Sequence, residues 1–337
     1  MRLKIKRRIV ASLLAAAAVI AVLAGALVHY AFTPAGAFTE PAQFDLRAGS
    51  SLRTAAQHME QAGVLRHAGL FVAMARLLGE SGNIKAGNYQ LETPVSPYEL
   101  LRKITRGDVS LSAITFIEGW TFRQMRRALD AHPEVKHDTR GMDDREILQR
   151  LSVIAPSPEG LFFPDTYHFS VGSSDLLILR RAYDRMQTQL TALWEGRAAG
   201  LPFATPYEAL ILASIVEKET GRAEERPLIA AVFVNRLRKG MPLQADPTVI
   251  YGLGESFDGN LRKRDLAADT PYNTYTRAGL PPTPIALPGA AALAAVLNPP
   301  QSDVLYFVSR GDGTSHFSRT LGEHERAVTK YQRSGGR

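Results

Sequence analysis

The chain has 337 residues, a composition ordinary for a globular protein and a formal net charge of +7. It contains no cysteine, which excludes disulfides and cysteine-based zinc sites. Five basic residues lie within the first eight positions, and the other 35 nearly balance 33 acidic residues, so the charge does not favour a nucleic acid partner.

The N-terminus predicts a membrane anchor. Residues 9–28 are twenty positions without a charge, long enough to cross a bilayer. The basic residues before them predict a cytoplasmic N-terminus, with the rest of the chain on the far side. A cleaved signal peptide is the alternative, because Ala35, Gly36 and Ala37 are small, although a signal core is usually about 7–15 residues. We expect a basic tail at 1–8, a retained span at 9–31 and a linker at 32–43.

Residues 44–108 predict a small module of strands and helices. The expected elements are a strand at 43–47, a helix capped by Ser51, a helix at 67–78 with Leu70, Phe71, Met74 and Leu77 or Leu78 inward, a strand at 83–92 and a helix at 98–106 ended by Gly107. The segment FDLRAGSSLRTAAQHM resembles the opening of LysM peptidoglycan-binding modules. A generic helix–strand cap on the main domain is the alternative.

The next hundred residues combine strands and helices. We expect a strand at 111–117, a helix opened by a capping box of Thr121 and Gln124, a helix at 138–151 and a long helix at 175–197. The segment 159–169 is rich in aromatic residues, which could stack on sugar rings, although such clusters more often form core.

Residues 205–240 predict two helices joined by a short polar elbow. Thr205, Pro206 and Glu208 are typical of a helix start, the apolar run 209–216 of a buried helix, and Gly221 of the position after a helix end. Glu217 falls in the last turn, where burial and the negative end of the helix dipole both raise a carboxyl pKa. A general acid working near neutral pH needs such an environment.

Helical geometry does not decide between Glu217 and Glu219, because each shares a stripe of the helix with apolar residues. The alternative to an acid site is a helix end with solvated charges, in which Lys218 and Arg222 neutralise the two glutamates.

The C-terminal third predicts a polar loop between helices. Asp246 before Pro247 is typical of a helix N-cap. The loop 269–287 is long and polar, as functional loops often are, and we expect Asn273 there to serve activity more than stability. A helix at 288–297, a hairpin of 304–309 with 316–319 and a helix capped by Thr320 and Glu323 follow.

The sequence contains no motif typical of metal, serine-nucleophile or phosphate-binding chemistry. The eight histidines are scattered, and the chain has no HExxH, GxSxG, SxxK or glycine-rich phosphate loop, so we expect no metal and no cofactor. A pyridoxal-phosphate lyase using Lys218 is opposed by the anchor and the missing phosphate loop. Carboxylate chemistry surrounded by amides, hydroxyls and tyrosines suits carbohydrate.

The long segments of the second half resemble the YceG-like family. They are ASIVEKETG, VFVNRL, LQADPTVIYGLG, PYNTYTRAGLPPTPIALPG and LYFVSRGDGTSHF, with EGW at 118–120 and LFFPDTYHF at 161–169 before them. The resemblance implies an α+β protein with an N-terminal transmembrane helix, a LysM-like subdomain at 44–108 and a larger mixed α/β catalytic domain at 109–337. It also implies an inner-membrane protein whose catalytic domain lies in the periplasm.

For activity, the resemblance implies endolytic cleavage of the MurNAc-β-1,4-GlcNAc bond of peptidoglycan to 1,6-anhydroMurNAc ends, with Glu217 as the catalytic residue. Glycan strands, and possibly the synthases that make them, are the expected partners. We expect a further set of residues to orient the sugars or support the site: Glu219, Gln244, Asp246, Thr248, Asn273, Thr274 and Tyr275.

The alternatives are a non-catalytic glycan-binding scaffold and a hydrolytic muramidase, which usually needs a second carboxylate. The sequence identifies no certain second carboxylate, since helix capping already accounts for the position of Asp246.

Overall fold

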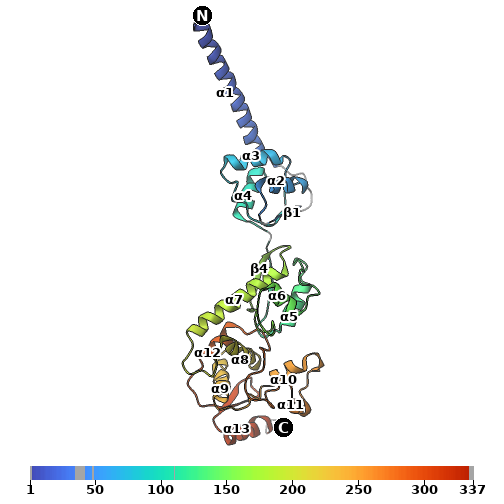
Figure 1. The fold of residues 1–337 in the computed structure, drawn as a ribbon, viewed down its shortest axis with the longest axis vertical. Helices are drawn as coiled ribbons and strands as arrows, with labels where there is room; N and C mark the ends of the chain where they lie inside the picture. Colours follow the sequence, from blue (N-terminus) through green and yellow to red (C-terminus); the bar gives the residue numbers. More distant parts are fainter. Residues whose placement is uncertain (1, 35–41, 48, 110, 334–337) are drawn as a thin grey trace. The chain divides into compact units, whose positions relative to one another are not determined.

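The computed structural model describes residues 2–34, 42–47, 49–109 and 111–333 (Figure 1). The protein contains both helices and strands, as expected, and the chain divides into two compact units. The N-terminal unit comprises Met1–Ser112 with His168–Gly172, and the C-terminal unit comprises Ala113–Tyr167 with Ser173–Arg337.

The first element is the long helix α1, Arg2–Phe32, whose portion Ser12–Phe32 is apolar and long enough to span a membrane. This N-terminal apolar helix indicates a single-pass membrane protein. The end of α1 packs on the small core of the N-terminal unit through Leu27, Tyr30 and Ala31. The small residues at 35–37, which would form a signal-peptide cleavage site, lie outside the described residues.

The rest of the N-terminal unit packs three helices with two strands. The elements are β1 (Ala42–Leu46), α2 (Leu52–Gln61), α3 (Ala68–Leu77), β2 (Gly87–Leu91) and α4 (Pro97–Arg106). The strands β1 and β2 are antiparallel, with Phe44 opposite Tyr89 and their rings stacked. Ser51 caps α2 and Gly107 ends α4 with a φ of 74°, both as predicted.

Helix α3 buries a different stripe from the one expected. Phe71 and Met74 are buried, but Leu70, Leu77 and Leu78 are exposed. The buried positions also include Ala68, Val72 and Ala75, so small residues let α3 lie close against its neighbours while the leucines point outward.

The C-terminal unit begins at a two-stranded sheet of β3 (Leu111–Thr115) and β4 (Thr166–Ser170), and the division between the units crosses both strands. Helix α5, Phe122–Ala131, opens with the predicted capping box. Helix α6, Asp144–Arg150, is shorter than predicted because Asp143 caps it. The aromatic side chains Phe162, Phe163 and Tyr167 are buried, so they belong to the core rather than to a sugar-stacking surface.

Four helices form the core around the elbow (Figure 1): α7 (Asp175–Glu195), α8 (Pro206–Glu219), α9 (Arg226–Arg238) and α12 (Ala290–Leu297). Every residue of Ala209–Val216 is buried, which confirms the prediction for α8. Gly221 does not end this helix in a left-handed conformation, since Thr220 is already extended with a φ of −143°.

The remaining elements surround this core. They are α10 (Asp246–Leu253), a 3₁₀ turn (Gly254–Ser256), α11 (Lys263–Ala267), the antiparallel hairpin of β5 (Tyr306–Ser309) with β6 (Ser315–Ser318), α13 (Leu321–Val328) and a π-helical turn (Thr329–Arg333). The loop 269–287 contains no regular helix or strand, as predicted.

Candidate active site

Glu217 lies in the last turn of α8 with only 5% of its side chain exposed. Its Oε2 accepts a hydrogen bond from the Gly289 N–H at 2.9 Å, and its Oε1 accepts one from Arg226 at 3.3 Å. Neither of the cations predicted to neutralise this helix end forms an ion pair with Glu217, because Lys218 donates to the Gly119 carbonyl and Arg222 to the Asp312 carbonyl. The charge of Lys218 still lowers the pKa of Glu217. Sequence reasoning missed Arg226, since it approaches only once the elbow folds α9 back against α8.

Two backbone segments, residues 118–120 and 285–289, pack around Glu217. The Ile285 N–H donates to the Ser214 hydroxyl on α8 at 2.9 Å, which explains the single polar residue in the apolar run. Gly119 and Trp120 pair with Leu287, through the Gly119 N–H to the Leu287 carbonyl and the Leu287 N–H to the Trp120 carbonyl. The end of α8, residues 118–120 and residues 285–289 therefore meet at Glu217.

A second carboxyl group, that of Glu118, lies close to this meeting point. A Cβ atom added to Gly289 would lie 1.8 Å from Glu118 Oε1, so the carboxyl rests against the Cα of Gly289. Since the Gly289 N–H binds Glu217, the carboxyl oxygens of Glu118 and Glu217 are at most about 8 Å apart. Sequence reasoning did not include Glu118 in the site, and its only indication was the family segment EGW.

The surroundings of Glu217 act on its proton affinity in both directions. Burial raises the pKa of the Glu217 carboxyl above its usual range, and the negative charge of Glu118 adds to this. The Gly289 N–H and the Arg226 guanidinium oppose the rise in pKa, because both favour the carboxylate. The pKa remains raised, as predicted for this helix end.

Glu219 lines a cavity of about 380 Å³ that Glu217 does not line. The same cavity is lined by Arg236, Gln244, Asp246 and Tyr275, so four of the predicted site residues gather there. Burial raises the pKa of Glu219 to about 8, and the nearby Asp246 carboxyl contributes while Arg236 opposes.

Asp246 does not cap α10, and this corrects the explanation that the sequence favoured. Ala245 is the N-cap residue, and Asp246 is already inside the first turn. The Asp246 carboxylate instead accepts a hydrogen bond from the Tyr275 hydroxyl at 2.5 Å. Gln244, whose φ is 51°, accepts a hydrogen bond from Arg236 through its side-chain oxygen.

Thr248, Asn273 and Thr274 are buried, and their polar groups bind other parts of the protein. The two threonine hydroxyls are hydrogen-bonded to each other at 2.9 Å, and Thr274 Oγ1 also accepts from the Ala245 N–H. These residues hold the loop 269–287 against the start of α10.

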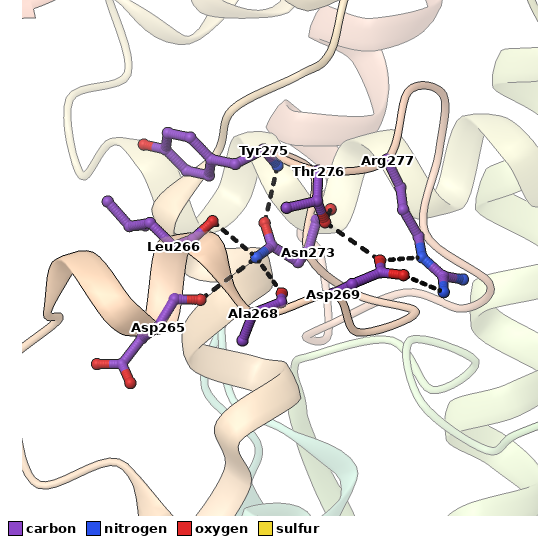
Figure 2. Close-up of polar contacts among 8 residues, drawn as sticks. All are labelled: Asp265, Leu266, Ala268, Asp269, Asn273, Tyr275, Thr276 and Arg277. Atoms are coloured by element: carbon purple, nitrogen blue, oxygen red, sulfur yellow. Dashed lines mark hydrogen bonds and ion pairs between the residues drawn. The ribbon is translucent and has the colours of Figure 1, made fainter.

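Asn273 organises its loop from the inside (Figure 2). Its side-chain amide donates to the carbonyls of Asp265, Leu266 and Ala268, and its oxygen accepts from the Tyr275 N–H at 2.9 Å. The sequence offered no packing reason for this residue, but the structure shows one, so the expectation that Asn273 serves activity more than stability loses its basis.

A larger cavity, about 1160 Å³, lies on another side of the end of α8. Lys218 and Ile285 line it, together with residues of α5 and α10. Glu159 also lines it and accepts hydrogen bonds from the Phe122 N–H and the Tyr251 hydroxyl. Burial raises the pKa of Glu159 to about 7. The residues that follow Glu217 thus face two cavities, Lys218 the larger and Glu219 the smaller.

A nearly buried glutamate with a raised pKa lies beside a second carboxyl group, and the two residues that follow it each line a cavity. This arrangement defines a site suited to acid–base chemistry on a polar substrate. The model of the YceG-like family matches residues 44–330. The chain therefore belongs to the YceG-like family.

Named relatives agree with this assignment. The endolytic murein transglycosylase of Bacillus subtilis (strain 168) is 31% identical over 304 residues, which cover 85% of this chain and 84% of the relative. The protein of the same name from Streptococcus pneumoniae serotype 2 is 28% identical over 320 residues, covering 85% of this chain and 57% of the relative. The crystal structure of a YceG-like protein from Listeria monocytogenes superposes with a TM-score of 0.53 at 30% identity, covering 86% of this chain and 99% of that one.

Proposed function

We propose that the protein is an endolytic lytic transglycosylase that cleaves the MurNAc-β-1,4-GlcNAc bond within peptidoglycan strands. The observation that carries the proposal is Glu217, a carboxyl group whose burial raises its pKa. Such a group can hold a proton near neutral pH and deliver it to a leaving oxygen. The names of the relatives from Bacillus and Streptococcus supply the substrate.

In the first step, Glu217 transfers its proton to the glycosidic oxygen as the bond from C1 of MurNAc to that oxygen breaks. The GlcNAc portion leaves with a free hydroxyl group, and the MurNAc ring passes through an oxocarbenium-like state. Glu217 is then a carboxylate, which the Gly289 N–H and Arg226 stabilise in place.

In the second step, the Glu217 carboxylate takes the proton of the C6 hydroxyl of the same MurNAc as O6 bonds to C1. A 1,6-anhydro ring forms, Glu217 regains its proton and no water is consumed. The attack is intramolecular, which removes the entropic cost of positioning a separate nucleophile.

The cavity beside Glu219 supplies groups for binding sugar. Gln244, Asp246 and Tyr275 line it and offer amide, carboxylate and hydroxyl groups, which suit sugar hydroxyls and N-acetyl amides. Glu219 supports the same cavity. Thr248, Asn273 and Thr274 are buried, so we assign them to holding this wall rather than to contacting the glycan.

The N-terminal unit carries the LysM-like subdomain in this proposal. The helix α1 anchors the protein in the inner membrane, and the C-terminal unit acts on the cell wall from the periplasmic side. Peptidoglycan synthases are the partners that fit an enzyme acting on glycan strands at the membrane. A non-catalytic scaffold would bind purified strands and leave their length unchanged.

Hydrolysis by a muramidase is the second candidate, because Glu118 provides the second carboxyl group that the sequence did not identify. The carboxyl oxygens of Glu118 and Glu217 are at most about 8 Å apart, which is below the upper limit of about 9.5 Å for glycosidase pairs. The two reactions differ in whether water supplies the new oxygen at C1.

Product analysis in oxygen-18 water separates the candidates. Purified glycan strands are incubated with the full-length protein in detergent, and the products are analysed by mass spectrometry before and after borohydride reduction. We expect new MurNAc ends that weigh one water less than the hydrolytic product, carry no label and resist reduction. A labelled, reducible end would show a muramidase, and strands of unchanged length would show a scaffold.

A further inference from the structure

We infer that Glu118 is the second carboxylate of the reaction centre, placed to stabilise the positive charge that develops on the sugar when Glu217 protonates the leaving oxygen. The inference rests on the proposed function and adds a residue to the same site. Its first support is position, because Gly289 contacts both carboxyl groups, Glu217 through its N–H and Glu118 through its Cα.

The backbone around Glu118 is held firmly. The next two residues pair with Leu287, and the Gly119 carbonyl also accepts a hydrogen bond from Lys218. Gly119 turns the chain with a φ of 77°, a conformation that favours glycine. Glu118 therefore starts from a fixed backbone position beside the acid, although its own side chain is exposed.

No structural role explains why the Glu118 side chain lies beside Gly289. Across the described ranges, no hydrogen bond or ion pair engages the Glu118 carboxyl group. Glu217, by contrast, is nearly covered and held by two partners. An exposed and uncommitted carboxylate next to a covered acid can approach a bound sugar from the open side of the site.

The charge of Glu118 has two effects on the reaction. It favours the protonated form of Glu217 before cleavage, since two nearby negative charges repel each other. As the bond to C1 breaks, the same charge attracts the oxocarbenium-like sugar, and this attraction strengthens when the substrate excludes water. Neither effect needs a proton transfer to Glu118, so the proton balance of ring closure is unchanged.

Gly289 provides a way to move Glu118 without altering it. An alanine Cβ at this position would overlap the Glu118 carboxyl oxygen, which lies at the end of a flexible side chain and can swing away. The φ of Gly289, −81°, suits alanine, and the Gly289→Ala backbone keeps the N–H that binds Glu217.

The experiment compares Glu118→Gln, Glu118→Asp, Gly289→Ala and the double variant Glu118→Gln with Gly289→Ala, using Glu134→Gln as an exposed control. The readouts are kcat, the pH dependence of kcat/KM on purified strands, and Tm. We expect Glu118→Gln to lower kcat at least about tenfold, as removal of a group that stabilises transition-state charge does. The alkaline limb of its pH profile should move to lower pH, because the charge that favours protonated Glu217 is gone.

Glu118→Asp keeps the charge and should restore the alkaline limb toward that of the unmodified protein. Gly289→Ala should lower kcat as well, and the double variant should lose little more than Glu118→Gln, because both changes remove the same carboxylate. Glu134→Gln should match the unmodified protein in every readout.

Two results would overturn the inference while leaving the proposed function standing. One is an active protein in which Glu217→Gln abolishes cleavage but Glu118→Gln keeps the original kcat and pH profile. The other is a double variant whose losses simply multiply, which would place the Glu118 carboxylate away from Gly289. If the unmodified protein does not cleave strands, the proposed function itself fails.

Discussion

The neighbours of Glu217 change the pKa of its carboxyl group in opposite directions. Burial raises its pKa, whereas Arg226 and the Gly289 N–H stabilise the carboxylate. A general acid that becomes a base in the next step needs both, because it must hold a proton before cleavage and tolerate a charge after it.

Glu217→Gln keeps the size of the side chain and can still accept the Gly289 N–H, but it has no proton to give. We expect a loss of at least about a hundredfold in the rate of strand cleavage, the low end for general acid catalysis. Glu219→Gln, on the smaller cavity, should lose less. Glu224→Gln in the exposed elbow is the matched control. Circular dichroism should show an unchanged fold. Near-normal turnover by Glu217→Gln would contradict the role of Glu217 as the general acid.

Arg226→Met tests the electrostatics of the same site. Arg226 lowers the pKa of Glu217, so its removal should raise that pKa and keep Glu217 protonated to higher pH. We therefore expect the alkaline limb of kcat/KM to move to higher pH, opposite in direction to the shift expected for Glu118→Gln. Arg226→Lys keeps the charge and should shift the limb less. An unmoved limb in Arg226→Met would show that Arg226 does not control the proton affinity of the acid.

At the scale of elements, the loop 269–287 borders the smaller cavity and is held by hydrogen bonds from its own side chains. Asn273 ties residues 265–268 to Tyr275, and Thr274 ties the loop to Thr248 and to the Ala245 N–H. The Tyr275 hydroxyl then reaches Asp246 in the smaller cavity. The polar composition of the loop therefore stabilises the loop's own conformation.

Asn273→Ala should destabilise the protein first and affect activity through the displaced loop. It leaves three partly buried carbonyl groups, those of Asp265, Leu266 and Ala268, without the Asn273 donor, so we expect a fall in Tm. Asp269→Asn alters an exposed ion pair with Arg277 in the same loop (Figure 2) and should change Tm little. An unchanged Tm for Asn273→Ala with reduced activity would instead support direct contact with the glycan.

At the scale of the whole molecule, the membrane helix is part of the folded N-terminal unit. The Tyr30 hydroxyl donates to the His67 carbonyl, and the ring of Phe32 packs against that of Tyr98. These contacts come after most of the apolar stretch, so the first folded residues beyond the span lie next to it along the chain.

Protease added to spheroplasts tests the topology. The basic tail and the apolar helix predict a cytoplasmic N-terminus, so the protease should digest the C-terminal unit while an N-terminal tag stays protected. A cytoplasmic marker protein is the control for intact membranes. Full protection of the chain, or a soluble mature form that begins near Phe38, would contradict a retained anchor.

The sequence alone determined the features that depend on neighbouring residues. Ser51, Thr121 and Thr320 each accept a hydrogen bond from a backbone N–H three positions later, so their helix starts can be predicted from a few letters. The buried run of α8 and the place of Glu217 in its last turn follow from helical periodicity in the same way.

Only the tertiary structure decided which groups meet at the site. Gly289 is 72 positions from Glu217, and Gly119 is 99 positions from Lys218, distances over which local preferences carry no information. For the same reason the sequence assigned Asp246 to a helix cap and left Glu118 out, although Asp246 meets Tyr275 and Glu118 lies against Gly289. The chemistry of each residue is local, but its partners depend on how α8, residues 118–120 and residues 285–289 pack together.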